Sequence, residues 1–234
     1  MLRLSNLVQQ FFGQNRFARR TAFSLLHWIE KGFLGRHKDI ATLELISRIR
    51  NEREALLTAS DAYALYSIAR AQLKHSGEWA EVGVFEGASA KLLCEAKGER
   101  RLHLFDTFTG LPDPDMPERS ILKKHQFRAD EQSVRQYLAP YPNVTFHVGL
   151  FPETGSAIND LRFSLVHLDV DLYRSTLDCL EFFYPRMIPG GIIVSHDYTI
   201  LAGVKAAVDN FFDDKPEGVL DLPSTQCVII RSVL

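Results

Sequence analysis

The sequence predicts an α/β fold with a central, mostly parallel, seven-stranded sheet flanked by helices. Three observations support this prediction. Short apolar segments typical of buried strands alternate with segments of helical periodicity over most of the 234 residues. A glycine turn joins the first of these strands to the helix after it. Polar residues directly follow several strands, and ligands of parallel sheets bind at the carboxyl ends of the strands.

The predicted elements form one domain over residues 51–234. The predicted helices span residues 51–76, 88–97, 130–138, 175–187 and 204–212. The predicted strands span residues 79–85, 102–105, 144–148, 163–168, 192–195, 219–222 and 226–231. Gly77 follows the first helix, as a glycine often does. Residues 163–168 are nearly continuously apolar, as a buried parallel strand should be. Pro189-Gly190-Gly191 ends the helix over 175–187.

Two segments lie outside this regular pattern. Residues 107–129 are charged and rich in proline, and such long loops in α/β domains are usually lids or binding loops, so we expect a lid within this segment, over residues 112–129. Residues 1–50 have helical periodicity and form a predicted N-terminal extension. No acidic residue occurs before Glu30, whereas arginines do. We consider three roles for this arm: packing on the domain or on a second subunit, lying on an anionic membrane, or serving as a cleaved targeting segment.

Composition excludes several classes of protein. The formal net charge is −2, which provides no overall basic field for nucleic acid. The three cysteines lack the spacing of a metal site and fall in apolar contexts, which indicates buried thiols in a reducing compartment. No apolar run is long enough to span a membrane. We therefore expect a cytoplasmic protein, with membrane-peripheral contact through the arm as an alternative, and a homo-oligomer.

The motif Glu81-Val-Gly-Val-Phe-Glu-Gly-Ala-Ser89 predicts a nucleoside-cofactor site. Its glycines allow a sharp turn and close approach of a ligand, and the helix that follows points free N–H groups at that ligand. Asp106 ends the second strand, where an acidic residue can accept hydrogen bonds from both ribose hydroxyls. The Gly-x-x-x-Gly spacing fits S-adenosylmethionine better than a dinucleotide.

A second polar cluster follows two neighbouring strands. Asp169 and Asp171 follow the strand over 163–168, and His196 and Asp197 follow the next one. Carboxylates at adjacent strand ends can bind a divalent cation such as Mg²⁺ or accept a substrate proton. The structural alternatives are that Asp169 or Asp171 caps the next helix and that His196 is only the partner of a neighbouring acid.

Five segments together resemble the macrocin and mycinamicin sugar O-methyltransferase family, which has the Rossmann-like class I methyltransferase fold and uses S-adenosylmethionine. They are the motif over 81–89, Phe105-Asp-Thr-Phe-Thr-Gly-Leu-Pro112, Gly149-Leu-Phe-Pro-Glu-Thr154, His167-Leu-Asp-Val-Asp-Leu-Tyr173 and Pro189-Gly-Gly-Ile-Ile-Val-Ser-His-Asp-Tyr198. The resemblance covers residues from about 50 to the C-terminus.

The resemblance implies roles for particular residues. Those around the cofactor would be Glu81, Gly83, Gly87 and Ser89 at its methionine end, Asp106 at the ribose, and Phe108. It also implies a Mg²⁺ bound by Asp169 and an acidic pair after the fifth strand. Here that pair is His196-Asp197, so a nitrogen donor replaces one carboxylate.

We therefore expect an O-methyltransferase that acts on a hydroxyl, most simply of a sugar or glycosylated small molecule. Asp169 is the expected base and metal ligand together, and His196 is the second candidate base. Two alternatives stay open: a non-catalytic scaffold that binds the cofactor, and a nucleotide-dependent dehydrogenase, against which the absence of Gly-x-Gly-x-x-Gly counts.

Overall fold

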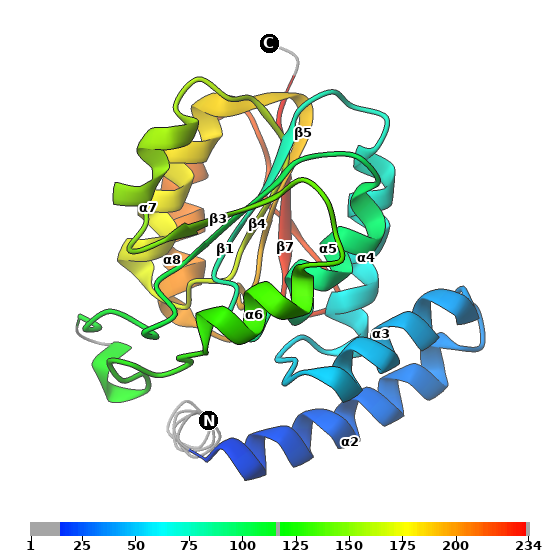
Figure 1. Cartoon of the computed structure of the whole chain (residues 1–234). Coiled ribbons are helices and arrows are strands. Elements are labelled where there is room, and N and C mark those ends of the chain that lie inside the picture. Colours follow the sequence, from blue (N-terminus) through cyan, green and yellow to red (C-terminus); the bar gives the residue numbers. More distant parts are fainter. Residues whose placement is uncertain (1–14, 116–117, 233–234) are drawn as a thin grey trace.

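The structure, a computed structural model, describes residues 15–115 and 118–232 (Figure 1). Its centre is a seven-stranded sheet with the strand order β3-β2-β1-β4-β5-β7-β6. The strands are β1 (Glu78–Val82), β2 (Leu102–Asp106), β3 (Val144–Val148), β4 (Phe163–Leu168), β5 (Met187–Ser195), β6 (Leu220–Asp221) and β7 (Cys227–Ile230). The first five pair in parallel, whereas β7 is antiparallel to both β5 and β6. The predicted mostly parallel sheet of seven strands is confirmed.

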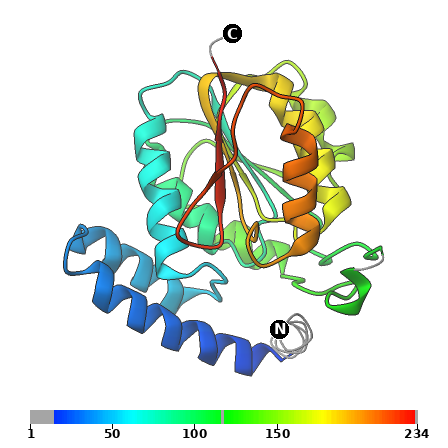
Figure 2. The same cartoon turned by 180° about the vertical axis from the view of Figure 1, so that it is seen from behind.

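Helices cover both faces of this sheet, as the two opposite views show (Figures 1 and 2). They are α4 (Ala59–Gln72), α5 (Ala88–Lys97) and α6 (Glu131–Leu138) on one side, and α7 (Tyr173–Phe183) and α8 (Ala202–Phe212) on the other. Side chains alternate along a strand, so Val228 packs in the first layer and Ile229 in the second. Short 3₁₀ turns at Glu118–Ser120, Glu153–Ile158 and Tyr184–Arg186 complete the chain.

Two predicted helices have different boundaries in the structure. The single helix expected over 51–76 is wrong: α3 (Ile40–Glu52) ends and α4 starts anew after a break. A capping box starts α4, because the Thr58 side chain accepts the Asp61 N–H while the Asp61 carboxylate accepts the Thr58 N–H. The helix expected over 175–187 ends four residues early, at Phe183, and the Pro-Gly-Gly segment belongs to β5 instead of preceding it.

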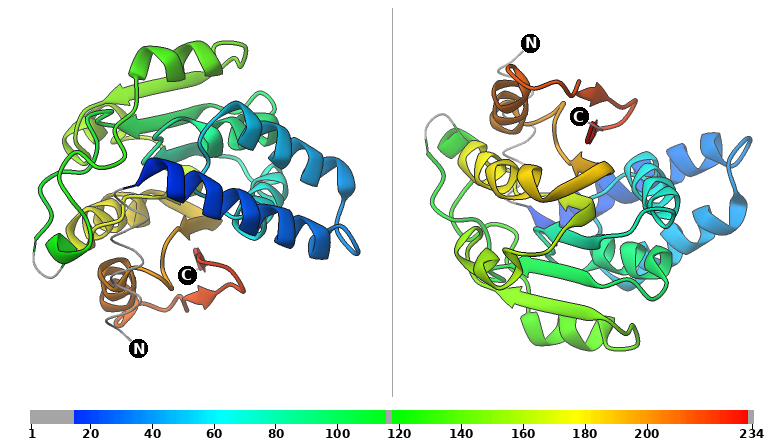
Figure 3. Two further views of the ribbon diagram at one scale, coloured as in Figure 1. Left: turned by 90° about the horizontal axis from the view of Figure 1, so that it is seen from below. Right: turned by 90° about the horizontal axis from the view of Figure 1, so that it is seen from above.

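The described part of the N-terminal arm is helical, as predicted. Helix α2 (Arg16–Leu34) packs on α4 and runs across the lower edge of the domain, where strands β1, β2, β4 and β5 end (Figure 3, left). Helix α3 joins the core through Leu43, Ile46 and Ile49, which are buried. Residues 1–14 of the predicted extension lie outside the described residues.

One polar contact fixes α2 against α3. His27 is buried, and its Nε2 lies 3.1 Å from Ser47 Oγ, a hydroxyl that itself donates to Leu43 O. The ring must therefore donate from Nε2, which leaves Nδ1 buried and without a hydrogen-bond partner in the described structure. Burial, with Arg50 and Lys31 nearby, lowers the pKa of His27 to about 4.

This contact predicts an acid-sensitive arm. The folded-state pKa of His27 lies below the usual value of about 6.5, so its contribution to stability is complete above that pH and is lost as the pH falls towards 4. His27→Gln keeps a donor for Ser47 without titrating. Urea unfolding at a series of pH values should show a smaller acid destabilisation in His27→Gln than in wild type, and parallel curves would contradict this.

Candidate active site

Each of the four central strands is followed by a residue with a left-handed backbone. They are Phe85 after β1, Phe108 after β2, Asp171 after β4 and Asp197 after β5, with φ values of 50°, 54°, 61° and 59°. Such a conformation costs a residue other than glycine about 1–3 kcal/mol and accumulates at functional sites. Four of them at one edge of the sheet indicate that this edge is the functional one.

Gly83 is required by the neighbouring strand. Its φ is 90°, and a β-carbon there would overlap the carbonyl oxygen of Asp169. The backbones after β1 and β4 therefore meet in direct contact, with Asp169 N–H donating to Val82 O at 2.9 Å. Gly87 is the N-cap of α5 and also has a positive φ, with Val134 of α6 packed against it. Gly83 thus serves the packing of two strand ends and Gly87 the packing of two helices, apart from any role with a ligand.

Asp106 holds the turn after β1. One carboxylate oxygen accepts the N–H groups of Val84 and Phe85 at 2.7 and 2.8 Å, and the other accepts the Phe108 N–H at 2.6 Å. Burial raises the pKa of Asp106, and these hydrogen bonds oppose that rise. The sequence predicted that this side chain contacts the ribose. The structure adds a second role, which the sequence motif did not indicate: the carboxylate fixes the backbone of the turn after β1.

The second cluster comes together as predicted. His196 Nδ1 lies 3.2 Å from Asp169 Oδ1 and 3.1 Å from Asp197 Oδ1. Burial disfavours charge on both partners, yet their mutual attraction prevails: the pKa of Asp169 is lowered and that of His196 is raised well above its usual value. Ligand atoms of these three residues lie within 4.8 Å of one another, so they could hold a metal ion.

Asp171 joins this cluster instead of capping a helix. Leu172 is the N-cap of α7 and makes no side-chain cap, so the capping alternative for Asp171 is wrong. Burial raises the pKa of the Asp171 carboxyl, and the nearby Asp197, to which it is hydrogen-bonded, raises it further. The sequence analysis offered both the cluster and helix capping for Asp171, and the structure supports the cluster.

Behind His196 lies a contact that the sequence analysis missed. His196 Nε2 lies 3.2 Å from Thr225 Oγ1, and that hydroxyl lies 3.0 Å from the fully buried carboxylate of Asp61. Asp61 belongs to the capping box of α4, and Thr225 precedes β7. Residues 164 positions apart thus orient one imidazole, and no local pattern marks such a pair.

Other predicted cofactor residues lie beneath the pocket. Glu81 and His167 are fully buried and paired, with Oε1 and Nδ1 2.8 Å apart, and Ser89 is hydrogen-bonded to the same carboxylate. Burial raises the pKa of Glu81, and His167 opposes the rise. Gly83, Asp106, Asp169, His196 and Asp197 line the main pocket, whereas Glu81, Gly87, Ser89 and Phe108 do not.

This pocket has a volume of about 400 Å³, within the range of small-molecule sites. Its polar floor consists of the strand ends already described. Its remaining walls are largely apolar and come from three regions: Phe23 and Leu26 of α2, Ile121, Leu122 and Phe127 of the predicted lid, and Ile200 and Leu201 before α8. The lid therefore borders the pocket, as expected for residues 112–129.

Comparison with known proteins identifies relatives of this chain. The model of the macrocin O-methyltransferase family (TylF) matches residues 64–219. The tetracenomycin rhamnosyl 4'-O-methyltransferase of Streptomyces olivaceus is 29% identical over 140 residues, which cover 53% of this chain and 54% of that protein. Mycinamicin III 3''-O-methyltransferase of Micromonospora griseorubida is 28% identical over 155 residues, or 58% and 61% of the two chains. The chain thus spans little more than half the length of these relatives.

Two solved structures share the fold. The O-methyltransferase NovP superposes with a TM-score of 0.68 at 22% identity, over 76% of this chain and 82% of that one. The calicheamicin methyltransferase CalS11 superposes with a TM-score of 0.66 at 20% identity, over 86% and 90% of the two chains. These likenesses confirm the predicted class I methyltransferase fold.

The hydrogen bonds of Asp106 predict that this side chain stabilises the protein even when no ligand is bound. Asp106→Asn replaces one acceptor oxygen by an N–H₂ group, so at least one of the three backbone N–H groups loses its partner. We expect the free energy of unfolding in urea to fall by about 1–3 kcal/mol even without ligand. The exposed Asp160→Asn is the matched control and should change it little. Unchanged stability of Asp106→Asn would remove the structural role.

Proposed function

The chain belongs to the macrocin O-methyltransferase family, and we propose that it transfers the methyl group of S-adenosylmethionine to a hydroxyl of a sugar or glycosylated metabolite. One observation carries the proposal: four strand ends bring Gly83, Asp106, Asp169, His196 and Asp197 to a single pocket. Relatives named for methylating a rhamnosyl tetracenomycin, a novobiocin precursor and mycinamicin III support this acceptor class over the scaffold and dehydrogenase alternatives. We also propose that the chain consists of an N-terminal arm over residues 1–50 and a catalytic domain over residues 51–234.

The residues of the pocket fit S-adenosylmethionine. Gly83 lines the pocket and presents no side chain, so a ligand can approach the backbone closely there. Asp106 keeps one unused acceptor position on the oxygen that binds Phe108 N–H, which we assign to a ribose hydroxyl. When bound, the cofactor supplies a methyl group on a sulfonium, which an alcohol oxygen can attack.

We assign to Asp169 the proton of that alcohol. Its side chain is 21% exposed in the pocket, whereas His196 is 4% exposed and is held by partners on both ring nitrogens. Asp169 can therefore reach an acceptor more easily than His196, the second candidate. The apolar lid and α2 would exclude water and align the hydroxyl, and such positioning is a major source of rate in group transfer.

The reaction predicts a ligand preference and a loss on substitution. S-adenosylhomocysteine should raise the melting temperature because it binds only the native state, and NAD should not. With an accepted glycoside and labelled cofactor, Asp169→Asn should lower kcat by about 100-fold or more, since it loses the charge that accepts the proton. S-adenosylhomocysteine affinity should stay close to that of wild type. Equal stabilisation by NAD, or full activity in Asp169→Asn, would contradict the assignment.

The cluster at Asp169 also fits a divalent cation. Three donor atoms, from Asp169, His196 and Asp197, lie on one side of the pocket. A metal-bound histidine usually donates its other N–H to an acceptor that fixes its ring, and here Thr225, backed by Asp61, is in that position. Imidazole binds metals only when neutral, so an ion would replace the proton that the two carboxylates hold on Nδ1.

We propose that this site prefers a first-row transition ion such as Mn²⁺ to the Mg²⁺ that the sequence suggested. Mg²⁺ favours an all-oxygen set of ligands, whereas imidazole suits the transition ions. The nitrogen of His196 stands where the family has a carboxylate oxygen, so this set of ligands favours transition ions over Mg²⁺. The ion would neutralise the neighbouring carboxylates and polarise an oxygen of the acceptor.

The metal proposal is tested by binding alone. Isothermal titration of chelator-treated protein should show tighter binding of Mn²⁺ than of Mg²⁺. Thr225→Val should weaken Mn²⁺ binding by about 10–100-fold through loss of the ring's anchor. His196→Asp should reduce the preference for Mn²⁺ over Mg²⁺, and the exposed His37→Asp is the control. An unchanged ion preference in His196→Asp would contradict the role of the imidazole.

The N-terminal arm and the assembly of the chain concern its partners. We propose that the arm contacts a membrane surface peripherally, and that the chain forms a homo-oligomer, which light scattering on a sizing column would measure. Among the described helices, none is long and apolar enough to cross a bilayer.

A further inference from the structure

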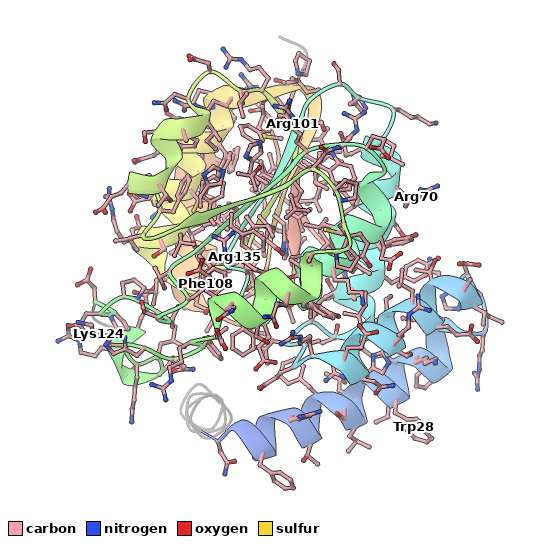
Figure 4. All side chains as sticks on the ribbon, viewed as in Figure 1. Trp28, Arg70, Arg101, Phe108, Lys124 and Arg135 are labelled. Carbon is pink, nitrogen blue, oxygen red and sulfur yellow. The ribbon has the colours of Figure 1, made fainter. Side chains whose placement is uncertain are left out.

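Helix α2 has two apolar faces with different surroundings. Its inner face contributes Ala22, Phe23 and Leu26 to the pocket. Its outer face is exposed, and Trp28 on it points away from the body of the molecule (Figure 4). Leu26 lines the pocket and is 40% exposed, so it lies at the rim that joins the two faces.

The outer face is unusually apolar for a surface helix. Phe17 and Trp28 are 83% and 73% exposed, and Leu25 beside them is 60% exposed. Among the positions of α2 described as exposed, Arg20 is the charged one. A helix that faced water alone would place its charges on this side, and an exposed apolar patch of this kind marks an interaction surface.

Basic residues outnumber acidic ones along α2 and the turn after it. The basic residues with described side chains there are Arg20, Lys31, Arg36 and Lys38, whereas the acidic ones are Glu30 and Asp39, in a chain with a formal net charge of −2. The lid that borders the pocket begins with the acidic residues Asp113, Asp115 and Glu118, and Arg119 forms an ion pair with Asp113. Its later part, 120–129, has no acidic residue and carries Lys123, Lys124 and Arg128, of which Lys124 extends from the outer end (Figure 4). Apolar residues within a basic surround match an anionic lipid surface.

The pocket itself is selective for a hydrocarbon beside a polar group. Its carboxylates lie at the strand ends, but α2 and the lid face them with Phe23, Leu26, Ile121, Leu122 and Phe127. A free sugar would place hydroxyls against these walls without partners, at a cost for each unpaired group. An amphiphile would place its hydroxylated head at Asp169 and its chain between α2 and the lid.

We propose that the acceptor is a membrane-borne amphiphile, with a sugar or other hydroxylated head on a lipid chain, and that α2 lies on an anionic bilayer so that the head enters the pocket from the membrane. This inference rests on the proposed methyl transfer and names its acceptor class. Nineteen residues of α2 extend over about 28 Å, enough to lie along the interface with Trp28 among the head groups.

Trp28 offers a direct readout of membrane contact. The chain has two tryptophans, and the other, Trp79, is fully buried in β1. Vesicles of phosphatidylglycerol and phosphatidylcholine with brominated acyl chains should therefore quench the Trp28 emission of the full chain. Quenching should weaken without phosphatidylglycerol or at high salt, and should disappear in Trp28→Phe.

Matched variants separate the face from other exposed apolar residues. Leu25→Glu puts a charge on the outer face of α2 without touching the pocket, and should abolish quenching while leaving stabilisation by S-adenosylhomocysteine unchanged. Leu220→Glu, on the edge strand β6, alters a residue that is 51% exposed and should do neither. Absence of quenching in wild type overturns the proposal. A dimer that Leu25→Glu dissociates, without quenching, would assign the face to a second copy and also overturn it.

The acceptor class is tested with alkyl glycosides below their micelle concentration. Protein saturated with S-adenosylhomocysteine should bind octyl glucoside at least about 100-fold more tightly than methyl glucoside, because each buried methylene adds roughly fourfold. Leu26→Ser should reduce the affinity for the octyl compound more than that for the methyl compound. If the octyl chain adds no affinity, including the case in which neither compound binds, the pocket does not take a lipid chain and the proposal fails.

These outcomes are distinguishable from failure of the proposed function. Methyl transfer to a soluble glycoside without a chain preference would keep the function and remove this inference. Quenching and chain preference in a protein that S-adenosylhomocysteine does not stabilise would instead remove the methyltransferase assignment and leave a lipid-binding surface.

Discussion

The contact between the backbones of Gly83 and Asp169 organises this site. The chain after β1 can approach the end of β4 only because residue 83 has no β-carbon, and the carbonyl of Asp169 occupies the space where one would lie. That approach fixes where β4 ends and therefore where the Asp169 side chain enters the pocket. It also sets the turn whose N–H groups Asp106 accepts, so both halves of the site depend on one short distance.

The electrostatics of the second half depend on a single imidazole. His196 lies between the carboxylates of Asp169 and Asp197 on one side and Thr225 with Asp61 on the other. Three acids within reach of one buried ring would repel one another without a positive charge among them. A proton on His196 supplies that charge in the structure as it stands, and a bound cation would supply it in the proposed holoenzyme. The same geometry therefore serves the free protein and a metal-loaded one.

The arm connects this chemistry to the surroundings of the molecule. Helix α2 forms one wall of the pocket and exposes aromatic residues on its other side, and His27 fixes it to α3 through Ser47. Because α2 both lines the pocket and forms part of the protein surface, a partner that binds its exposed side would also lie next to the pocket entrance. Phe17 and Trp28 are exposed on that other side, and Arg20 is the charged residue among the positions of α2 described as exposed.

The sequence by itself determined the sheet, its parallel character and the edge at which the polar residues gather, because strand periodicity and short connections leave few ways to arrange such a chain. It also indicated that Asp169, His196 and Asp197 meet, since adjacent parallel strands end side by side. Only the tertiary structure decided what each residue touches. Asp61 and Thr225 reach His196 from distant segments, Asp106 turns to its neighbours' N–H groups, and Glu81 is buried against His167. Such contacts depend on packing between elements, which no local pattern records.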